Sequence, residues 1–253
     1  MTVHFIGAGP GAADLLTVRA VALLAASPVC VYAGTYVGQE ILAHCPDGAT
    51  LIDSRHLDLD QITAHLVRAH AAGQDVARLC SGDPSIYSAL AEQTRRLDAA
   101  GVPWDVTPGV PAYAAAAALL GLELTVPEVA QTVILTRTQA ASTQMPAGET
   151  LSRLAESRAT LVLHLAIRRT RELSAELAVH YGPTCPVAVV ANATGPGEVI
   201  LRGTLTDIAD QVEAANLRQA AVILVGEAVR DAARDHLVES HLYGPRDRRP
   251  AGS

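Results

Sequence analysis

Short glycine- and proline-rich segments follow three apolar runs in the first half of the chain, and they are the residues best suited to hold a ligand. They span residues 7–11 (G-A-G-P-G), 81–85 (S-G-D-P-S) and 107–112 (T-P-G-V-P-A). Loops at the carboxyl ends of strands form the ligand sites of open α/β sheets. One such segment alone is typical of an ordinary turn. Together, the three predict a small-molecule site at one edge of a sheet.

The first segment does not fit a dinucleotide site, although its glycines resemble the G-x-G-x-x-G pattern. A dinucleotide-binding turn opens its helix at once and is followed about 20 residues later by an acid. Here helical periodicity starts only near Thr17, and residues 28–33 contain no acid. Pro10 also removes one backbone N–H from the loop. These features favour a ligand without phosphate, and S-adenosylmethionine is such a ligand.

Several other chemistries are excluded by what the sequence lacks. All 19 basic residues are arginine, so a Walker-type phosphate loop and lysine nucleophiles are ruled out. The chain has no H-E-x-x-H, no G-x-S-x-G and no cluster of metal-ligating residues, so no metal site is expected. The sequence names no general base.

Composition limits the cellular setting and the partners. The chain has 253 residues, a net charge of −7 and 49% hydrophobic residues. Its apolar runs are too short to cross a bilayer, and its start lacks a signal peptide, so we expect a cytoplasmic protein without a membrane partner. The acidic balance argues against nucleic acid as a partner. The four widely spaced cysteines fit reduced, buried thiols.

One dense basic cluster, at residues 168–171, interrupts this acidic balance. It falls in a helix-like stretch, and we interpret it as a solvated helix face. The tail at residues 244–253 is rich in Arg, Pro and Gly, and it is expected to be flexible.

Apolar runs alternate with helical periodicity along most of the chain. Strands are expected at residues 3–6, 29–32, 50–52, 76–80, 104–107, 133–137, 160–165, 186–190, 199–202 and 221–225. Helices are expected at residues 17–26, 35–44, 58–72, 85–100, 149–157, 167–180 and 204–215. Asp58 with Gln61 resembles a capping box, and Thr204 with Asp207 is expected to cap the last helix.

This alternation predicts an α/β fold of two sequential domains, each with a mostly parallel sheet covered on both faces. Gly121 and Pro127 interrupt the pattern and indicate a boundary. The expected division is an N-terminal domain at residues 1–120, a C-terminal domain at 121–243 and a flexible tail at 244–253.

In combination, these motifs resemble the tetrapyrrole (class III) methylases, the S-adenosylmethionine-dependent enzymes of cobalamin and sirohaem synthesis. The match runs from about Val3 to Val229. Residues 32–36 and 131–137, with Met145, Pro146 and Glu149 beyond them, resemble members that methylate a precorrin on the route to cobalamin, with precorrin-4 as the expected substrate. The resemblance implies that cofactor and substrate lie in a trough between two α/β domains, and that the protein is a homodimer.

The resemblance also assigns roles to single residues. The cofactor-binding positions that it implies are Pro10, Ser81, Gly82, Asp83, Ile86, Pro111, Ala112, Leu165, Ala193 and Ala221. Tyr32 and Tyr36 fall in a substrate-binding segment. Arg137 is the expected grip for a substrate carboxylate, because a guanidinium binds carboxylates bidentately.

Some positions depart from the family pattern and leave alternatives open. Ala191 and Asn192 stand where relatives tend to have an aromatic residue and an arginine, and Ala140 and Ala141 stand where relatives have an arginine. Ala33 replaces an acid found in relatives that methylate uroporphyrinogen. The alternatives are another target within the superfamily, such as RNA or a protein histidine, and a binding relative that has lost turnover.

Overall fold

The computed structural model describes residues 1–138 and 144–230 as two compact units. The first unit contains Met1–Ala115 and Asn192–Pro196, and the second contains Ala116–Ala191 and the described residues from Gly197 onward. The predicted domain bounds stay a prediction. None of the helices in the two described ranges has the length and apolar character needed to cross a membrane.

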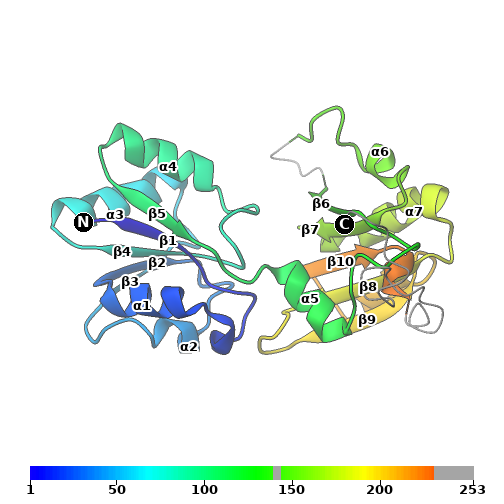
Figure 1. Cartoon of the computed structure of the whole chain (residues 1–253), viewed down its shortest axis with the longest axis horizontal. Helices are drawn as coiled ribbons and strands as arrows, with labels where there is room; N and C mark the ends of the chain where they lie inside the picture. The colour runs from blue at the N-terminus through cyan, green and yellow to red at the C-terminus, as the bar shows by residue number, and fades with distance from the viewer. Residues whose placement is uncertain (139–143, 231–253) are drawn as a thin grey trace, which may run out of the picture. The chain divides into compact units, whose positions relative to one another are not determined.

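The first unit is built on a five-stranded, fully parallel sheet (Figure 1). Its strands are β1 (Val3–Gly7), β2 (Val29–Tyr32), β3 (Thr50–Asp53), β4 (Val76–Cys80) and β5 (Trp104–Thr107), in the order β3-β2-β4-β1-β5. The parallel arrangement was predicted and is confirmed here. It brings the carboxyl ends of the neighbouring strands β4, β1 and β5 to one edge.

Helices cover both faces of this sheet (Figure 1). They are η1 (Ala13–Leu15), α1 (Val18–Ala26), α2 (Gln39–Leu42), α3 (Leu59–Ala71) and α4 (Leu90–Ala99). One face packs Leu24 of α1 and Ile41 of α2 against Ile6, and the other packs Leu66 of α3 and Leu97 of α4 against Phe5. The predicted Asp58–Gln61 capping box opens α3, as expected from its local spacing.

Two predicted helices of the first unit are wrong in extent. The helix expected at residues 35–44 is reduced to α2, because residues 33–37 form a turn in which the N–H groups of Tyr36 and Val37 bond to the Ala33 carbonyl. The helix expected at 85–100 begins only at Leu90. Tyr87 and Ala89 both have a φ of 55°, which a right-handed helix does not allow.

The second unit contains a five-stranded sheet of mixed direction (Figure 1). Its strands are β6 (Val133–Arg137), β7 (Thr160–His164), β8 (Pro186–Ala191), β9 (Val199–Thr204) and β10 (Ala221–Val225), in the order β6-β7-β10-β8-β9. Only β6 and β7 pair in parallel, so the prediction of a mostly parallel sheet is wrong here. The short connection between β8 and β9 lacks a crossover helix, and such connections join antiparallel neighbours.

Helices of the second unit pack on this sheet around Leu163, Leu173 and Ile208. They are α6 (Leu151–Ala155), η2 (Ile167–Arg169), α7 (Thr170–Tyr181), α8 (Ile208–Ala214) and η3 (Glu227–Val229), while α5 (Ala112–Leu120) begins in the first unit and ends in the second. The expected helices at 149–157 and 204–215 are longer than α6 and α8. Asp207 is the N-cap of α8, whereas Thr204 ends β9 and donates its N–H to the Asp207 carboxylate at 2.6 Å.

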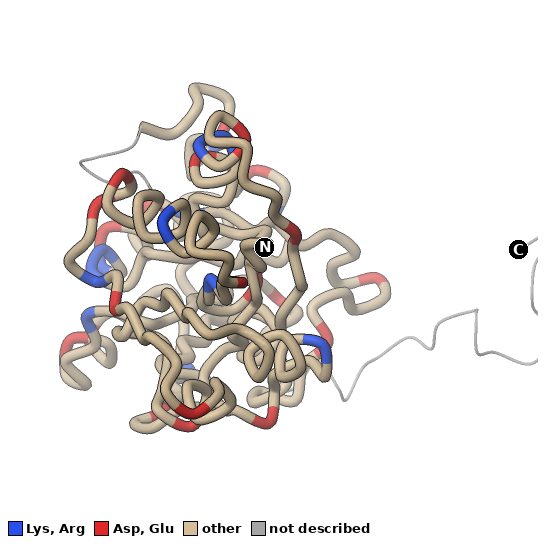
Figure 2. The backbone as a smooth tube through the Cα atoms, turned by 90° about the vertical axis from the view of Figure 1, so that its left-hand side faces the viewer, with Lys and Arg blue, Asp and Glu red and all other residues tan. Residues whose placement is uncertain are grey.

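Basic and acidic residues are interspersed along the described chain, as Figure 2 shows. The predicted solvent face of the basic cluster is confirmed for its arginines: Arg168 and Arg171 are exposed, Arg169 is half-buried, and Arg169 and Arg171 pair with acids. Arg169 contacts Glu172 at 2.8 Å, and Arg171 contacts Glu213 at 2.8 Å as well as Asp210. Cys30, Cys80 and Cys185 are buried, and Cys45 is half-buried.

Candidate ligand site

The three glycine- and proline-rich segments meet at the carboxyl edge of the first sheet. The first and second segments exchange two backbone hydrogen bonds, with Gly9 donating to the Gly82 carbonyl at 3.1 Å and Gly82 donating to the Gly9 carbonyl at 2.8 Å. Their contact follows from the sheet order, since β1 and β4 are parallel neighbours. The predicted convergence of the three segments is therefore present in the structure.

Glycine is required where the segments touch. A Cβ atom on Gly7 would lie 2.4 Å from the backbone nitrogen of Gly109, and one on Gly109 would lie 2.3 Å from the Gly82 carbonyl oxygen. Both distances are far inside van der Waals contact with backbone atoms, which cannot rotate away. The glycines thus permit a close backbone junction of all three loops.

Asp83 ties the second loop to the third. One oxygen of its carboxylate accepts hydrogen bonds from the N–H and the hydroxyl of Ser85, the former at 2.8 Å, and the other accepts the N–H of Gly109 at 2.8 Å. Burial by itself would raise the pKa of Asp83, but these hydrogen bonds outweigh it and hold the pKa below its ordinary value. The carboxylate therefore stays ionised and orders the junction.

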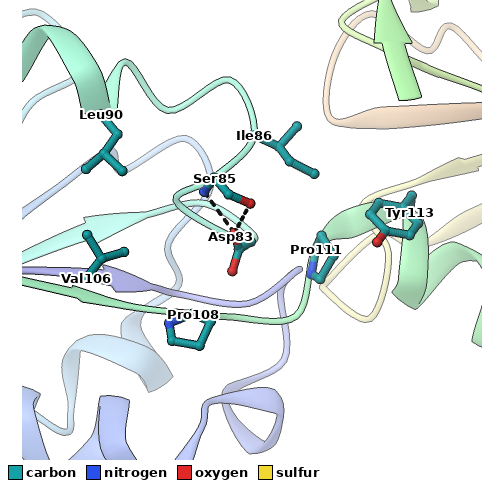
Figure 3. A pocket seen from close by; sticks show the side chains of 8 residues that line it. All are labelled: Asp83, Ser85, Ile86, Leu90, Val106, Pro108, Pro111 and Tyr113. Atoms are coloured by element: carbon teal, nitrogen blue, oxygen red, sulfur yellow. Dashed lines mark hydrogen bonds between the residues drawn. The ribbon is translucent and has the colours of Figure 1, made fainter. Parts of the chain in front are cut away.

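A pocket of about 490 Å³ opens beside this junction (Figure 3). Three residues predicted from the sequence line it: Asp83, Ile86 and Pro111. Ser85 and Pro108 also line it and belong to the segments singled out in the sequence, whereas sequence reasoning missed Leu90, Val106 and Tyr113. Most of these side chains are apolar, so the pocket suits the apolar face of a ligand, such as a heteroaromatic ring.

The first loop has few N–H groups left for a ligand. Ala8 donates to the Cys80 carbonyl at 2.8 Å, Gly9 donates to Gly82, and Pro10 has no N–H. Ala12 donates to the hydroxyl of Thr194 at 3.1 Å. A phosphate cradle needs several free donors in one loop, so this loop is poorly suited to one.

The short segment at Asn192–Pro196 packs on the first loop. A Cβ atom on Gly11 would lie 2.8 Å from the carbonyl oxygen of Ala193, so Gly11 allows a close backbone approach. Ala193 is therefore brought beside Pro10 and Gly11, where it joins the residues predicted for the same ligand. Its neighbours Asn192 and Thr194 both have positive φ, at 48° and 62°.

The predicted substrate segment lies at the carboxyl end of β2. The Tyr32 carbonyl accepts the N–H of Ser54 at 2.7 Å, and the Asp53 carboxylate accepts the N–H of Gly34 at 3.0 Å. Hydrogen bonds from the backbone of Arg55 and of Gly34 lower the pKa of Asp53. These contacts fix the turn, and the side chain of Tyr36 is 41% exposed on it.

The second sheet gathers the other predicted residues at one of its edges. Arg137 ends β6 and is paired in register with His164 at the end of β7, and Leu165 follows directly. Ala221 begins β10 opposite Ala191, and because β10 is antiparallel to β8 its first residue lies at the edge where β8 ends. The Arg137 guanidinium donates to the Thr138 carbonyl at 3.2 Å.

The structure thus forms two groups of predicted residues. The second unit contains Arg137, Leu165 and Ala221. The first unit contains the others, which are Tyr32, Tyr36, Pro10, Ser81, Gly82, Asp83, Ile86, Pro111, Ala112 and Ala193. Their roles as ligand contacts stay predictions. The departures at Ala140 and Ala141 lie outside the described residues.

Comparisons with known proteins give the site its context. Residues 2–209 match the family model of Tetrapyrrole (Corrin/Porphyrin) Methylases. The chain is 58% identical to the precorrin-4 C(11)-methyltransferase of Rhodococcus erythropolis over 96% of each sequence. A solved cobalt precorrin-4 methyltransferase of cobalamin biosynthesis has a TM-score of 0.87 and 35% identity, covering 90% of this chain and 96% of that one. The uroporphyrin-III C-methyl transferase of Thermus thermophilus, solved with S-adenosylhomocysteine, has a TM-score of 0.76 and 29% identity, covering 91% of this chain and 94% of that one.

Proposed function

The chain belongs to the tetrapyrrole methylase family, and from this premise we propose that it transfers a methyl group from S-adenosylmethionine to C11 of precorrin-4, which yields precorrin-5 in cobalamin biosynthesis. It is a methyltransferase. The observation that carries the substrate assignment is the identity of 58% over nearly the whole chain to a relative named for this reaction.

The first unit is proposed to hold S-adenosylmethionine at its loop junction. The fit rests on two features: donors of the first loop are already used within the protein, and the adjoining pocket is lined mainly by apolar side chains. Both suit a ligand without phosphate. The proposed contacts of S-adenosylmethionine in the first unit are Pro10, Ser81, Gly82, Asp83, Ile86, Pro111, Ala112 and Ala193. Those in the second unit are Leu165 and Ala221.

When bound, S-adenosylmethionine would supply an electrophilic methyl group on its sulfonium for transfer to an electron-rich carbon of the reduced tetrapyrrole, with S-adenosylhomocysteine as the leaving group. The chain's own residues orient the reactants and exclude water. The glycine junction fixes three loops relative to one another, Asp83 ties the second loop to the third, and Ile86 and Pro111 line the pocket with apolar groups. Arg137, Tyr32 and Tyr36 are proposed to hold the substrate.

The proposal is tested with purified protein, labelled S-adenosylmethionine, and precorrin-4 with and without cobalt. Label should appear in the tetrapyrrole, at C11 by carbon NMR. Label on another ring carbon, or on another precorrin only, would contradict the substrate assignment. Cofactor binding without any transfer would instead identify a binding relative that has lost turnover.

Calorimetry separates the proposed cofactor from a dinucleotide. S-adenosylhomocysteine should bind with a dissociation constant in the micromolar range or below, whereas NAD should give no measurable heat, since the first loop lacks donors for a pyrophosphate. Tight binding of NAD without binding of S-adenosylhomocysteine would overturn the cofactor proposal.

Leu165 offers a test of the second-unit contacts. Its φ is 54° and its side chain is 69% exposed, an arrangement that costs a leucine roughly 1–2 kcal/mol. The substitution Leu165→Gly removes that strain and should leave the stability equal or about 1 kcal/mol higher, after the entropy that glycine loses on folding. If the leucine covers the cofactor, S-adenosylhomocysteine should bind about tenfold more weakly.

Arg158→Gly is the matched control, because Arg158 also has a positive φ, of 51°. It lies just before β7, whereas Leu165 lies just after it. It should show a similar change in melting temperature with unchanged affinity. Unchanged affinity in both variants would remove Leu165 from the cofactor site.

Two further features stay proposals. We propose that the protein is a cytoplasmic homodimer, as the resemblance to the family implies. Light scattering on the eluted protein should give twice the chain mass of 26.3 kDa, and a mass of one chain would contradict it.

A further inference from the structure

A buried arginine lies beneath the loops of the first unit. Arg78 sits in the central strand β4, two residues before the strand ends, and is only 8% exposed. Burial lowers the pKa of its guanidinium, but a guanidinium keeps its proton in proteins. In the described part of the chain, Arg78 forms no ion pair with a carboxylate, so a positive charge is buried among neutral groups.

All the hydrogen-bond partners of Arg78 are neutral oxygen atoms. Its Nε donates to the side-chain oxygen of Gln93 at 2.9 Å. Its Nη1 lies 3.4 Å from the Val31 carbonyl, 3.4 Å from the Ser54 hydroxyl and 3.3 Å from the Leu79 carbonyl. The guanidinium therefore joins four segments: β2, the turn after β3, β4 itself and helix α4.

One side of this network supports the turn that carries Tyr32 and Tyr36. Ser54, which receives the Nη1 contact, donates both its N–H and its hydroxyl to the Tyr32 carbonyl, at 2.7 and 2.9 Å. Arg78 also contacts the carbonyl of Val31, one residue earlier. The position at which the turn leaves β2 is thus set by groups that Arg78 holds.

The other side supports the segment that carries Ile86. Gln93 is 1% exposed, and its side-chain nitrogen donates to the carbonyls of Ser88 and Ala89, at 3.1 Å each. This segment is strained, since Tyr87 and Ala89 both have a φ of 55°, and α4 has no side-chain cap at Ala89. Gln93, itself oriented by Arg78, supplies the contacts that hold the segment out of the helix.

A buried charge with only neutral partners is a poor stabiliser, and apolar side chains of similar size commonly serve a core as well or better. The hydrogen bonds of Arg78 are better explained by a role in orienting neighbouring segments than by a contribution to the stability of the fold. We propose that Arg78 is a positioning residue whose hydrogen bonds set the 32–36 turn and the 85–89 segment in place together. This inference rests on the proposed function, since it assigns substrate and cofactor to those two segments.

The test compares Arg78→Lys, Arg78→Met and Gln93→Met with a control, Arg96→Met. Arg96 lies on the same helix as Gln93, and it bonds to Asp60 of α3 at 3.1 Å, away from both segments. Amide hydrogen exchange reports the order of residues 32–37 and 85–89 without any ligand. Calorimetry with S-adenosylhomocysteine, turnover of precorrin-4 and melting temperature complete the set.

Arg78→Met should accelerate amide exchange in both segments about tenfold or more and weaken the binding of S-adenosylhomocysteine about tenfold. It should also lower kcat, while the melting temperature stays near that of the parent protein. Gln93→Met should loosen 85–89 while sparing 32–37. Arg78→Lys should show the same fast exchange in both segments as Arg78→Met, because lysine keeps the charge but lacks the Nε donor and the planar guanidinium. The control should match the parent protein in exchange, affinity and kcat.

Unchanged exchange in both segments of folded Arg78→Met would overturn the proposal, as would full recovery by lysine. If Arg78→Met does not fold, the Gln93→Met comparison still decides, because exchange equal to the parent at 85–89 would overturn the link through Gln93. Failure of the proposed function is separate. In that case the parent protein would not methylate precorrin-4, while the exchange results would still report on Arg78.

Discussion

Replacing Asp83 by alanine is expected to remove most of the activity while leaving the fold intact. The carboxylate accepts the N–H of Gly109 and two donors of Ser85, so its loss leaves donors of two loops without an acceptor. Ser85 is exposed and its donors can turn to water, so the cost falls on the half-buried N–H of Gly109. An unsatisfied donor costs about 1–3 kcal/mol, which corresponds to about a 5- to 150-fold loss of cofactor affinity if the loops must reclose on binding. Affinity for S-adenosylhomocysteine and single-turnover methyl transfer measure the effect.

Asp105→Ala is the matched control, because Asp105 lies on β5 near the same loops but pairs with His4 at 2.9 Å on an exposed surface. That variant should keep parental affinity. Asp83→Asn should recover only part of the loss, since an amide has a single acceptor oxygen for donors on both sides of the carboxylate. Parental affinity and turnover in Asp83→Ala would show that the junction does not need this carboxylate.

The direction of the Asp83 pKa predicts the pH dependence of the junction. A carboxylate whose pKa is lowered in the folded state contributes stability above its unfolded pKa, and it loses that contribution as the pH falls through the folded value. Cofactor affinity should therefore be insensitive to Asp83 between neutral pH and about pH 5. A loss of affinity in the parent near pH 6 that is absent from Asp83→Asn would contradict this direction.

Local signals explain which parts of the fold could be predicted. Asp58 and Gln61 cap α3 through bonds three residues apart, and such spacing is visible in the sequence. The start of α4 could not be found in this way. Residues 85–89 have acceptable helix formers, and they leave the helix because Gln93 and Asp83 hold them in another conformation. Those contacts depend on tertiary structure.

Strand direction in the second sheet has a similar explanation. An apolar run predicts a strand but not its direction, and β10 is buried between β7 and β8 whichever way it runs. The missing helix between β8 and β9 was the available sequence signal for an antiparallel pair.

The site was predictable where it depends on strand order. Loops after β1, β4 and β5 meet because those strands are parallel neighbours, so Gly7, Gly82 and Gly109 could be expected at one edge. The partners of these loops could not be predicted. The bond from Ala12 to Thr194 joins residues 182 apart in the chain, and the contact of Tyr113 with the pocket depends on how α5 begins. No sequence periodicity encodes either contact.

Arg137→Ala is expected to raise the Michaelis constant for precorrin-4 by about 10- to 100-fold, while leaving S-adenosylhomocysteine affinity nearly unchanged. The substrate carries many carboxylates and the protein has a net charge of −7, so binding needs a local arginine. Arg137 ends β6 at the same edge as Leu165 and Ala221, and it is only half-buried. A charge-assisted, bidentate contact to one carboxylate is worth about 1.5–3 kcal/mol, which sets the expected range.

Arg137→Lys should recover only part of this loss, because an ammonium cannot match the two oxygens of a carboxylate at once. Arg171→Ala provides the control, since Arg171 is an exposed arginine of the same unit that pairs with Glu213. Rising salt should weaken substrate binding in the parent more than in Arg137→Ala, as an ionic contact requires. Equal losses for substrate and cofactor would instead assign Arg137 to the cofactor site or to the fold, and no loss for either would leave it outside the site. The affinities for the two ligands therefore distinguish an arginine that binds substrate from a structural arginine at the edge of the second sheet.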